Sequence, residues 1–297
     1  MDRLLIVEPL GGLANRLRVV ASASLTAPAA GRRIELRWRR DRACGASWDE
    51  LFAPRFTSCD GEHPAEAHIY DRELSNFARP GSGDIVEDPA AVVLVRTCFQ
   101  FRPSTMSIDE FVAGKAAFYR GLIPVPVVQQ RLDELAARLA GAPTVGVHVR
   151  RSDLVLAGTP PERISPTSRF IARMRELLAA EPKTRFFLAT DDRQEEARIA
   201  TAFPGRVLTQ PERELARSDA TAIQHALVDW LALARSGRIL RSAGTSFSRE
   251  AAIAGGVPRE TIRRRLWPYD RPRFWIEAWH RRMSGWRRRA GLDRAYR

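Results

Sequence analysis

Short apolar runs alternate with segments of helical period along the chain, and this alternation constrains the fold more than any other feature. It is clearest in the second half, where strands are expected at Val145–Val149, Arg185–Ala189 and Arg238–Leu240. Helices are expected between them, at Ser168–Ala180 and Asp219–Ser236. Strands that are joined through helices pair in parallel, so this pattern predicts an α/β fold with a Rossmann-like second half.

The first half shows the same alternation less regularly. Strands are expected at Leu4–Val7, Ile34–Trp38 and Val92–Val95, and a helix at Leu13–Ala27. The segment Pro64–Pro89 is rich in Pro, Gly and Ser and is expected to be irregular. The first half therefore also predicts a parallel sheet.

The boundary between the halves is expected at Ile123-Pro124-Val125-Pro126, directly after a predicted helix at Ile108–Arg120. Two prolines restrict the backbone and disfavour continuation of that helix. We therefore divide the chain into an N-terminal domain (1–124), a C-terminal domain (125–257) and a basic tail (258–297).

Composition limits the function classes. The chain has no run of about 18 apolar residues, so a transmembrane helix is not expected. Its three cysteines, Cys44, Cys59 and Cys98, lack metal-type spacing and indicate reduced thiols in a cytoplasmic protein. The net charge is +13, but no nucleic-acid-binding motif accompanies it, so a nucleic-acid partner is not expected.

Much of the positive charge lies in the tail, where residues 259–297 contain 13 arginines and four carboxylates. Trp275, Trp279 and Trp286 share one face of a predicted helix. Two interpretations stay open. The helix docks this face on the body, or it lies on an anionic membrane surface, which would place the protein at the inner face of the membrane.

Gly11-Gly12-Leu13-Ala14-Asn15-Arg16 follows the first strand and opens a helix. Glycines allow a tight turn and close approach to a ligand, and the free N–H groups of a helix start suit an anion or a sugar. Many strand-to-helix turns carry glycines, so an ordinary turn is the alternative.

A more specific pattern is His148-Val149-Arg150-Arg151-Ser152-Asp153, where a buried strand runs into two arginines and a carboxylate. Ligands of open α/β sheets bind at the carboxyl ends of the strands. Alternation sends His148 and Arg150 to one face and Arg151 to the other. An arginine fork suits a diphosphate, and a structural ion-pair cluster is the alternative.

Two further strand ends carry polar residues. Asp191 and Asp192 follow the strand Arg185–Ala189; they could bind a metal, but no third ligand is visible nearby, and an N-cap role for one of them is equally consistent. Ser242–Glu250 follows the next strand and opens a helix, where hydroxyl groups and N–H groups can bind phosphate or simply cap the helix.

Taken in order, these four motifs resemble those of the α1,6-/α1,2-/protein O-fucosyltransferase superfamily. They are Gly11–Arg16, His148–Asp153, Phe187–Asp192 and Gly244–Ser248, and the nearest kind of relative is the bacterial nodulation-type fucosyltransferase. The resemblance spans about residues 4–255. It implies a GT-B fold, in which two Rossmann-like domains face each other across a cleft, and a glycosyltransferase with the donor held mainly by the C-terminal domain.

The resemblance also implies the chemistry. The donor is GDP-fucose or a related GDP-sugar, the reaction is inverting and needs no metal, and the acceptor is a hydroxyl of a glycan or glycolipid. Arg150 would bind the β-phosphate of the donor and stabilise the departing GDP. His148 and Asp229 would contact guanine, whose N1–H and amino group suit a carboxylate. An ion pair of Asp229 with an arginine such as Arg150 is the alternative.

The remaining matched positions complete the predicted site. Asn15 would face the donor across the cleft, Asp153 would orient Arg150 or Arg151, and Glu162 would be the base that deprotonates the acceptor. The other donor-binding residues on this basis are Gly12, Arg151, Asp192, Thr245, Ser246, Phe247 and Ser248, with Ser246 and Ser248 on the phosphates.

Two other functions remain open from the sequence: a transferase that uses a different nucleotide sugar, and a non-catalytic nucleotide-binding module. The acceptor itself is not specified, because acceptor pockets lie on variable loops such as Cys59–Pro89.

Overall fold

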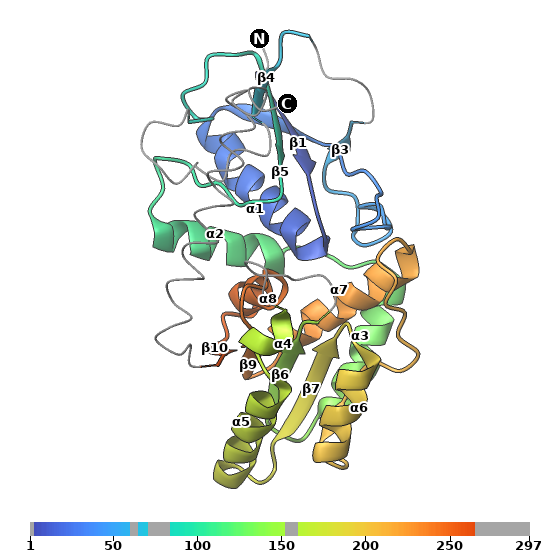
Figure 1. The fold of residues 1–297 in the computed structure, drawn as a ribbon. Coiled ribbons are helices and arrows are strands. Elements are labelled where there is room, and N and C mark those ends of the chain that lie inside the picture. The colour runs from blue at the N-terminus through green and yellow to red at the C-terminus, as the bar shows by residue number, and fades with distance from the viewer. Residues whose placement is uncertain (1–2, 60–64, 71–83, 152–159, 265–297) are drawn as a thin grey trace, which may run out of the picture.

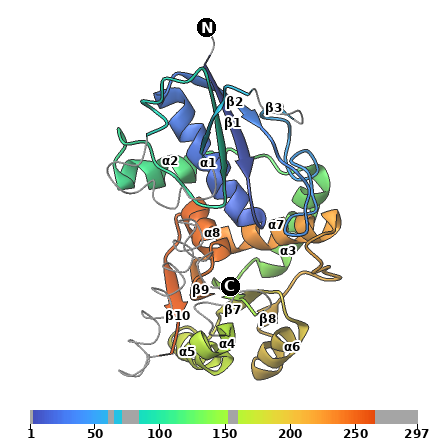
Figure 2. The same cartoon turned by 45° about the horizontal axis from the view of Figure 1, so that its top comes forward.

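The computed structural model describes residues 3–59, 65–70, 84–151 and 160–264. Asp153, a predicted site residue, lies outside this part of the chain, as does most of the basic tail. Within it, the chain forms two stacked α/β units, with helices between their sheets (Figures 1 and 2). No helix of the described residues is both long and apolar enough to cross a bilayer.

The N-terminal unit holds one five-stranded sheet with the order β3-β2-β1-β5-β4, and all its pairings are parallel. The strand β1 lies in the middle and leads through Gly11-Gly12 into the long helix α1. The elements are β1 (Arg3–Pro9), α1 (Leu13–Ala29), β2 (Arg32–Leu36), β3 (Thr57–Ser58), β4 (His68–Tyr70), β5 (Val92–Thr97) and α2 (Ile108–Arg120).

The C-terminal unit holds a second parallel sheet, ordered β10-β9-β6-β7-β8. Its central strands β6 and β7 are buried along almost their whole length, as expected of a parallel sheet covered on both faces. The elements are α3 (Pro126–Leu139), β6 (Thr144–Val149), α4 (Pro161–Ile164), α5 (Thr167–Ala180), β7 (Arg185–Thr190), α6 (Arg193–Ala202), β8 (Val207–Leu208), α7 (Ala220–Ala234), β9 (Arg238–Ser242), α8 (Phe247–Gly255) and β10 (Arg259–Ile262).

Helix boundaries follow local chemistry. Ser107 and Glu110 form a capping box at the start of α2, and Asp219 accepts a hydrogen bond from the Ala222 N–H at the start of α7. The helix α8 ends at Gly256, whose φ of 64° is left-handed. These caps define where α2 and α7 begin and where α8 ends.

The predicted α/β class with two parallel sheets is confirmed, and three details differ. The strand β2 begins at Arg32, two residues before the predicted start. The segment expected to be irregular contains β4, which pairs with β5. Arg259–Ile262, assigned to the helical tail, forms β10; its alternating exposure and the Glu260–Arg173 ion pair suit an edge strand.

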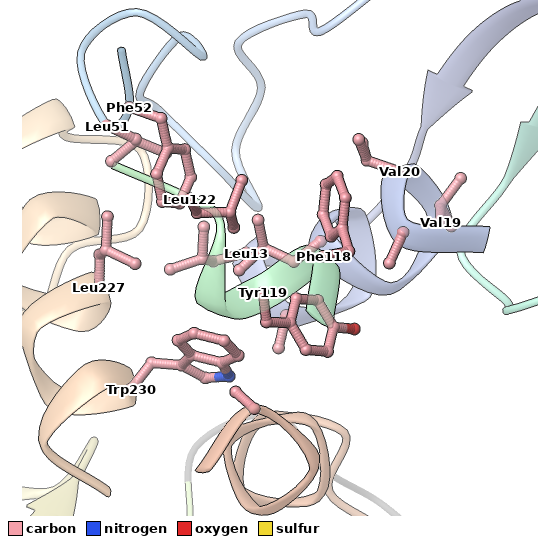
Figure 3. Close-up of a cluster of buried hydrophobic side chains, with 14 of the residues drawn as sticks. Leu13, Val19, Val20, Leu51, Phe52, Phe118, Tyr119, Leu122, Leu227 and Trp230 are labelled. Atoms are coloured by element: carbon pink, nitrogen blue, oxygen red, sulfur yellow. The ribbon is translucent and has the colours of Figure 1, made fainter. Parts of the chain in front are cut away.

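The two units share one apolar core. Leu13, Phe118 and Tyr119 of the N-terminal unit pack in the same cluster as Leu227 and Trp230 of α7 (Figure 3). The Tyr119 and Trp230 rings meet edge to face, with centroids 5.3 Å apart. Burial of this surface fixes the two sheets relative to each other.

Polar contacts reinforce this junction. The Lys115 ammonium group and the Tyr119 hydroxyl, both on α2, donate to the Glu250 carboxylate of α8, and both charged groups are fully buried. At Gly45 the backbone N–H donates to the Arg217 carbonyl, and a Cβ there would lie 2.2 Å from the Ser218 carbonyl oxygen. The backbones of the two units therefore approach too closely for any other residue at position 45.

Candidate functional site

A cavity of about 750 Å³ lies where the carboxyl ends of β1, β5, β6 and β9 converge. We call it the main cavity. Its described lining includes five arginines and no carboxylate, which makes it suited to an anion. The polar and aromatic side chains that line it are Asn15, Arg18, Phe99, His148, Arg150, Arg217, Arg241, Thr245, Ser246, Phe247 and Arg249.

A second, smaller space of about 80 Å³, the side pocket, shares His148, Arg150 and Phe247 with the main cavity. It extends toward α7 and adds Asp191 and Asp229 to the lining. A ligand with one narrow and one broad part could therefore occupy both spaces at once.

Arg150 follows β6 and lines both spaces, as the sequence predicts. Its Nε lies 3.0 Å from the Asp191 carboxylate, and its backbone N–H donates to the Ser242 hydroxyl of β9. The two neighbouring strands thus fix the backbone and the side chain of Arg150. This arrangement holds a guanidinium at the edge of the sheet, where ligands of such sheets bind.

Arg151, predicted to bind the donor, lines neither of the two spaces. Its Nη2 donates to the Thr167 hydroxyl at 2.9 Å and lies 3.5 Å from the Glu195 carboxylate. Its backbone N–H donates to Asp191 at 2.8 Å. The strand alternation explains the difference: Arg151 faces α5 and α6 and anchors them to the sheet.

The two aspartates after β7 are divided in the same way. Asp191 lines the side pocket, although the sequence analysis selected its neighbour. Asp192 instead caps α6, where its Oδ1 accepts from the backbone N–H groups of Gln194 and Glu195. Asp192 therefore belongs to the support of the site, as the N-cap alternative proposed.

His148 is buried between α8 and the side pocket. Its ring stacks on Phe247, with centroids 5.1 Å apart, and its Nδ1 lies 2.9 Å from the Ser248 hydroxyl. Burial, together with the positive charge of Arg150, lowers the pKa of His148 to about 3. A neutral imidazole therefore forms this wall at physiological pH.

The turn before α8 faces the main cavity through Thr245 and Ser246. Gly244 adopts a left-handed φ of 74°, which turns the chain sharply after β9. Ser248, predicted to bind phosphate, does not line either space: it is fully buried and bonds to His148, Thr245 and Arg241. Ser248 supports the wall from behind.

The opposite wall comes from the N-terminal unit. Gly12 and Asn15 line the main cavity, as predicted for residues that face the donor. Gly11 has a φ of 80°, and a Cβ there would lie 3.1 Å from the Asn15 amide nitrogen. The glycine turn therefore leaves room for Asn15 at the start of α1.

Four arginines that line the main cavity were not among the predicted site residues: Arg18, Arg217, Arg241 and Arg249. Arg18 lies one helical turn after Asn15, so helical period alone could have placed it on the same face. Arg241 is near the carboxyl end of β9, a position that the rule for strand ends indicates. Arg217 lies in a loop and carried no sequence signal.

Asp229 lines the side pocket at its α7 side and has internal partners. The Arg213 guanidinium donates to Oδ2 at 2.9 Å, and the Gln210 amide donates to Oδ1. Burial raises the pKa of Asp229, and the charge of Arg213 opposes that rise. The alternative of an ion pair is thus present, with Arg213 in place of Arg150.

Glu162, the predicted base, lies outside the cavity. It is on α4, its side chain is 61% exposed, and its carboxylate is 3.8 Å from Arg198. It lines a separate surface depression with Arg163, Arg169 and Arg264. Two prolines, Pro160 and Pro161, stand at the start of α4. The base role of Glu162 therefore stays a prediction that the described cavity does not support.

Among the described residues, no group of three potential ligands is arranged to hold a metal ion. The Asp191 carboxylate, a candidate ligand in the sequence, already pairs with the Arg150 side chain and the Arg151 backbone.

Comparison with known proteins gives the fold. The chain superimposes on NodZ alpha-1,6-fucosyltransferase soaked with GDP-fucose with a TM-score of 0.62, 19% identity and coverage of 86% of this chain and 93% of that one. For FUT1 of Arabidopsis thaliana in complex with GDP the TM-score is 0.58 and the identity 14%, with coverage of 88% of this chain and 70% of that one. For POFUT1 in complex with GDP-fucose the TM-score is 0.55 and the identity 10%, with coverage of 88% of this chain and 97% of that one.

No family model and no curated protein matches the sequence. The structural similarity shows that the chain has the GT-B fold of these fucosyltransferases, as the motif resemblance predicted.

Proposed function

We propose that the protein is a glycosyltransferase that transfers fucose from GDP-fucose to an acceptor hydroxyl. The observation that carries the proposal is the position of Arg150, held by Asp191 and Ser242 at the point where the main cavity meets the side pocket. The similarity to fucosyltransferase structures that contain GDP or GDP-fucose supports the choice of donor.

The donor fits the two spaces in one direction. Guanine would enter the side pocket, between His148 and Asp229, because the neutral imidazole and the carboxylate can both bond its edge. The diphosphate would then lie at Arg150 and at the turn of Thr245 and Ser246, where the start of α8 favours negative charge. The sugar would face Asn15 across the main cavity.

The proposed reaction is inverting. The acceptor oxygen attacks the anomeric carbon from the face opposite to the phosphate and releases its proton to solvent. The bond from that carbon to the β-phosphate oxygen breaks, and GDP leaves with the bonding electrons. Negative charge grows on the β-phosphate as this bond breaks, and the Arg150 guanidinium would stabilise it. No carboxylate among the described residues lines the main cavity, so we assign no general base.

We further propose that transfer needs no divalent metal, because arginines can supply the charge at the diphosphate. Activity should survive chelation and should not rise when manganese or magnesium is added. Complete loss on chelation, with recovery on metal addition, would contradict this proposal.

A transfer and donor-hydrolysis assay tests the function as a whole. GDP-fucose should be consumed in preference to GDP-mannose and UDP-sugars. Preference for another donor would favour the transferase of different donor specificity. Tight GDP binding without turnover of any donor would favour the non-catalytic nucleotide-binding module.

Asp229→Asn tests the base specificity. The variant should bind GDP more weakly by roughly 1.5–3 kcal/mol, because a neutral amide replaces a charged acceptor. It should also reduce the preference for GDP over inosine diphosphate, which lacks the exocyclic amine. Calorimetric titration of both nucleotides decides this. Unchanged GDP affinity with a lower melting temperature would assign Asp229 only to its pair with Arg213.

A further inference from the structure

The floor of the main cavity carries a surplus of positive charge. Lys115 and Arg249 both contact the Glu250 carboxylate, so this single carboxylate already serves two cations. Arg18 and Arg241 lie close enough to feel the same charges, yet neither forms an ion pair with a carboxylate of the described residues. Four cations therefore share one carboxylate, and such clusters are costly unless an anion joins them.

The pKa shifts of Arg18 and Arg241 are consistent with this excess of positive charge. Burial, followed by the charge of Arg249, lowers the pKa of Arg18. Burial, followed by the charges of Arg259 and Arg249, lowers the pKa of Arg241 to about 10. An arginine side chain is not deprotonated in proteins, so both guanidiniums carry their charge against the repulsion of their neighbours.

Arg18 lies beside Phe99, and we call these two residues the platform. Its Nε and Nη2 both donate to the Cys98 carbonyl, and its guanidinium carbon lies 5.6 Å from the centre of the Phe99 ring. The Phe99 side chain is 40% exposed and lines the main cavity. An exposed aromatic ring beside a guanidinium offers an apolar face for packing and a charge for an anion.

This platform stands apart from the proposed donor contacts. Arg150, Thr245 and Ser246 all belong to the C-terminal unit, whereas Arg18 and Phe99 belong to the opposite wall. A diphosphate at the C-terminal wall would be neutralised there by Arg150, Arg241 and the start of α8. The charge of Arg18 is then left for the second substrate.

We propose that Arg18 and Phe99 form the acceptor subsite and that the acceptor is a saccharide carrying a carboxylate or a phosphate group. This proposal rests on the proposed function and adds the chemical class of the acceptor to it. The sugar ring would pack on Phe99, and its anionic group would meet Arg18, which holds the acceptor against the sugar of the donor.

Equilibrium titration of the GDP-saturated protein tests the proposal. One arm compares methyl glucuronoside with its neutral methyl ester, and the other compares glucose 6-phosphate with glucose. In at least one arm the charged probe should bind about tenfold more tightly or better, as expected of one charge-assisted contact. The arm that responds identifies the anionic group. Equal binding of charged and neutral probes in both arms would overturn the proposal.

Arg18→Gln should abolish the charge preference and leave GDP affinity unchanged. Arg55→Gln is the matched control, because Arg55 also lies over an aromatic ring, Phe118 at 4.8 Å, and donates to a backbone carbonyl, yet does not line the main cavity. It should leave both affinities unchanged. If Arg18→Gln weakened GDP binding as much as probe binding, Arg18 would belong to the donor site and the proposal would be wrong.

Phe99→Ala gives an independent measurement should Arg18→Gln fail to fold. It should weaken the charged and the neutral probe by the same factor, because it removes the packing surface and keeps the charge. Unchanged probe binding would exclude the platform. Absence of GDP binding to the wild-type protein would instead overturn the proposed function, so the two failures are distinguishable.

Discussion

Two pairs of adjacent residues, Arg150-Arg151 and Asp191-Asp192, form the edge of the C-terminal sheet. One side of this edge faces the cavities, and the other faces α5 and α6. Arg150 and Asp191 line the side pocket and pair with each other. Their neighbours face the other side: Arg151 contacts Thr167 and Glu195, and Asp192 caps α6. Because successive side chains leave a strand on opposite faces, each pair supplies one residue to the ligand side and one to its support.

The largest expected effect concerns the ligand side. Arg150→Lys should lower the transfer rate ~100- to 1000-fold, about 2.7–4 kcal/mol, because lysine keeps the charge but loses the planar fork. The melting temperature should stay close to that of the wild type. Near-wild-type turnover in the purified variant would exclude Arg150 from stabilising the leaving group.

The matched change on the support side should affect stability instead. Arg151→Met should reduce the free energy of unfolding by about 2–3 kcal/mol, because the buried Glu195 loses a charged donor and the Ser165 carbonyl loses a hydrogen bond. Denaturant unfolding measures this loss, and turnover per folded molecule should be retained. A large rate loss with unchanged stability would place Arg151 in the ligand site after all.

The pH dependence of stability tests whether the buried His148 imidazole is neutral. Its folded pKa of about 3 lies below the unfolded value near 6.5, so its contribution to stability is complete above pH 6.5 and is lost as the pH falls from there toward 3. At pH 5.5 the loss relative to pH 7.5 should be about 1.4 kcal/mol. The difference in unfolding free energy between wild type and His148→Gln should show this slope. Parallel curves would contradict a buried neutral imidazole.

The smallest effect is expected at the helix cap. Asp192→Ala should cost ~1 kcal/mol of unfolding free energy, the usual value for loss of an N-cap, and leave GDP affinity unchanged. Asp219→Ala, which removes the equivalent cap of α7, is the control. Weaker GDP binding in Asp192→Ala alone would restore Asp192 to the donor site.

The periodicity of the apolar residues and the order of the motifs along the chain were enough to predict the general fold. Alternation of strands and helices predicted both parallel sheets, and the alternation along one strand predicted the opposite directions of Arg150 and Arg151. The same alternation places Asp191 beside Arg150, whereas the motif match had selected Asp192, which caps α6. The phosphate role of Ser248 stays a prediction; in the structure its hydroxyl meets His148, a contact that spacing along α8 does not indicate.

Other parts of the site depend on distant contacts and carry no local signal. The Glu250 carboxylate is balanced by Lys115, which is 135 residues away in the sequence. Arg213 and Gln210 reach Asp229 from the segment between β8 and α7. Only the packing of the two units brings such residues together, so neither period nor spacing could identify them.

The shared core of the two units bears on how such a protein can acquire a new acceptor. Tyr119 and Trp230 pack against each other from opposite units, and Lys115 and Glu250 are buried together at the same junction. A half-molecule taken from a distant relative would leave one member of each pair unmatched, with apolar surface exposed and a charge stranded. We therefore expect natural variation in acceptor choice to accumulate at positions that line the main cavity, such as Arg18 and Phe99. Recombination between half-molecules should be selected against.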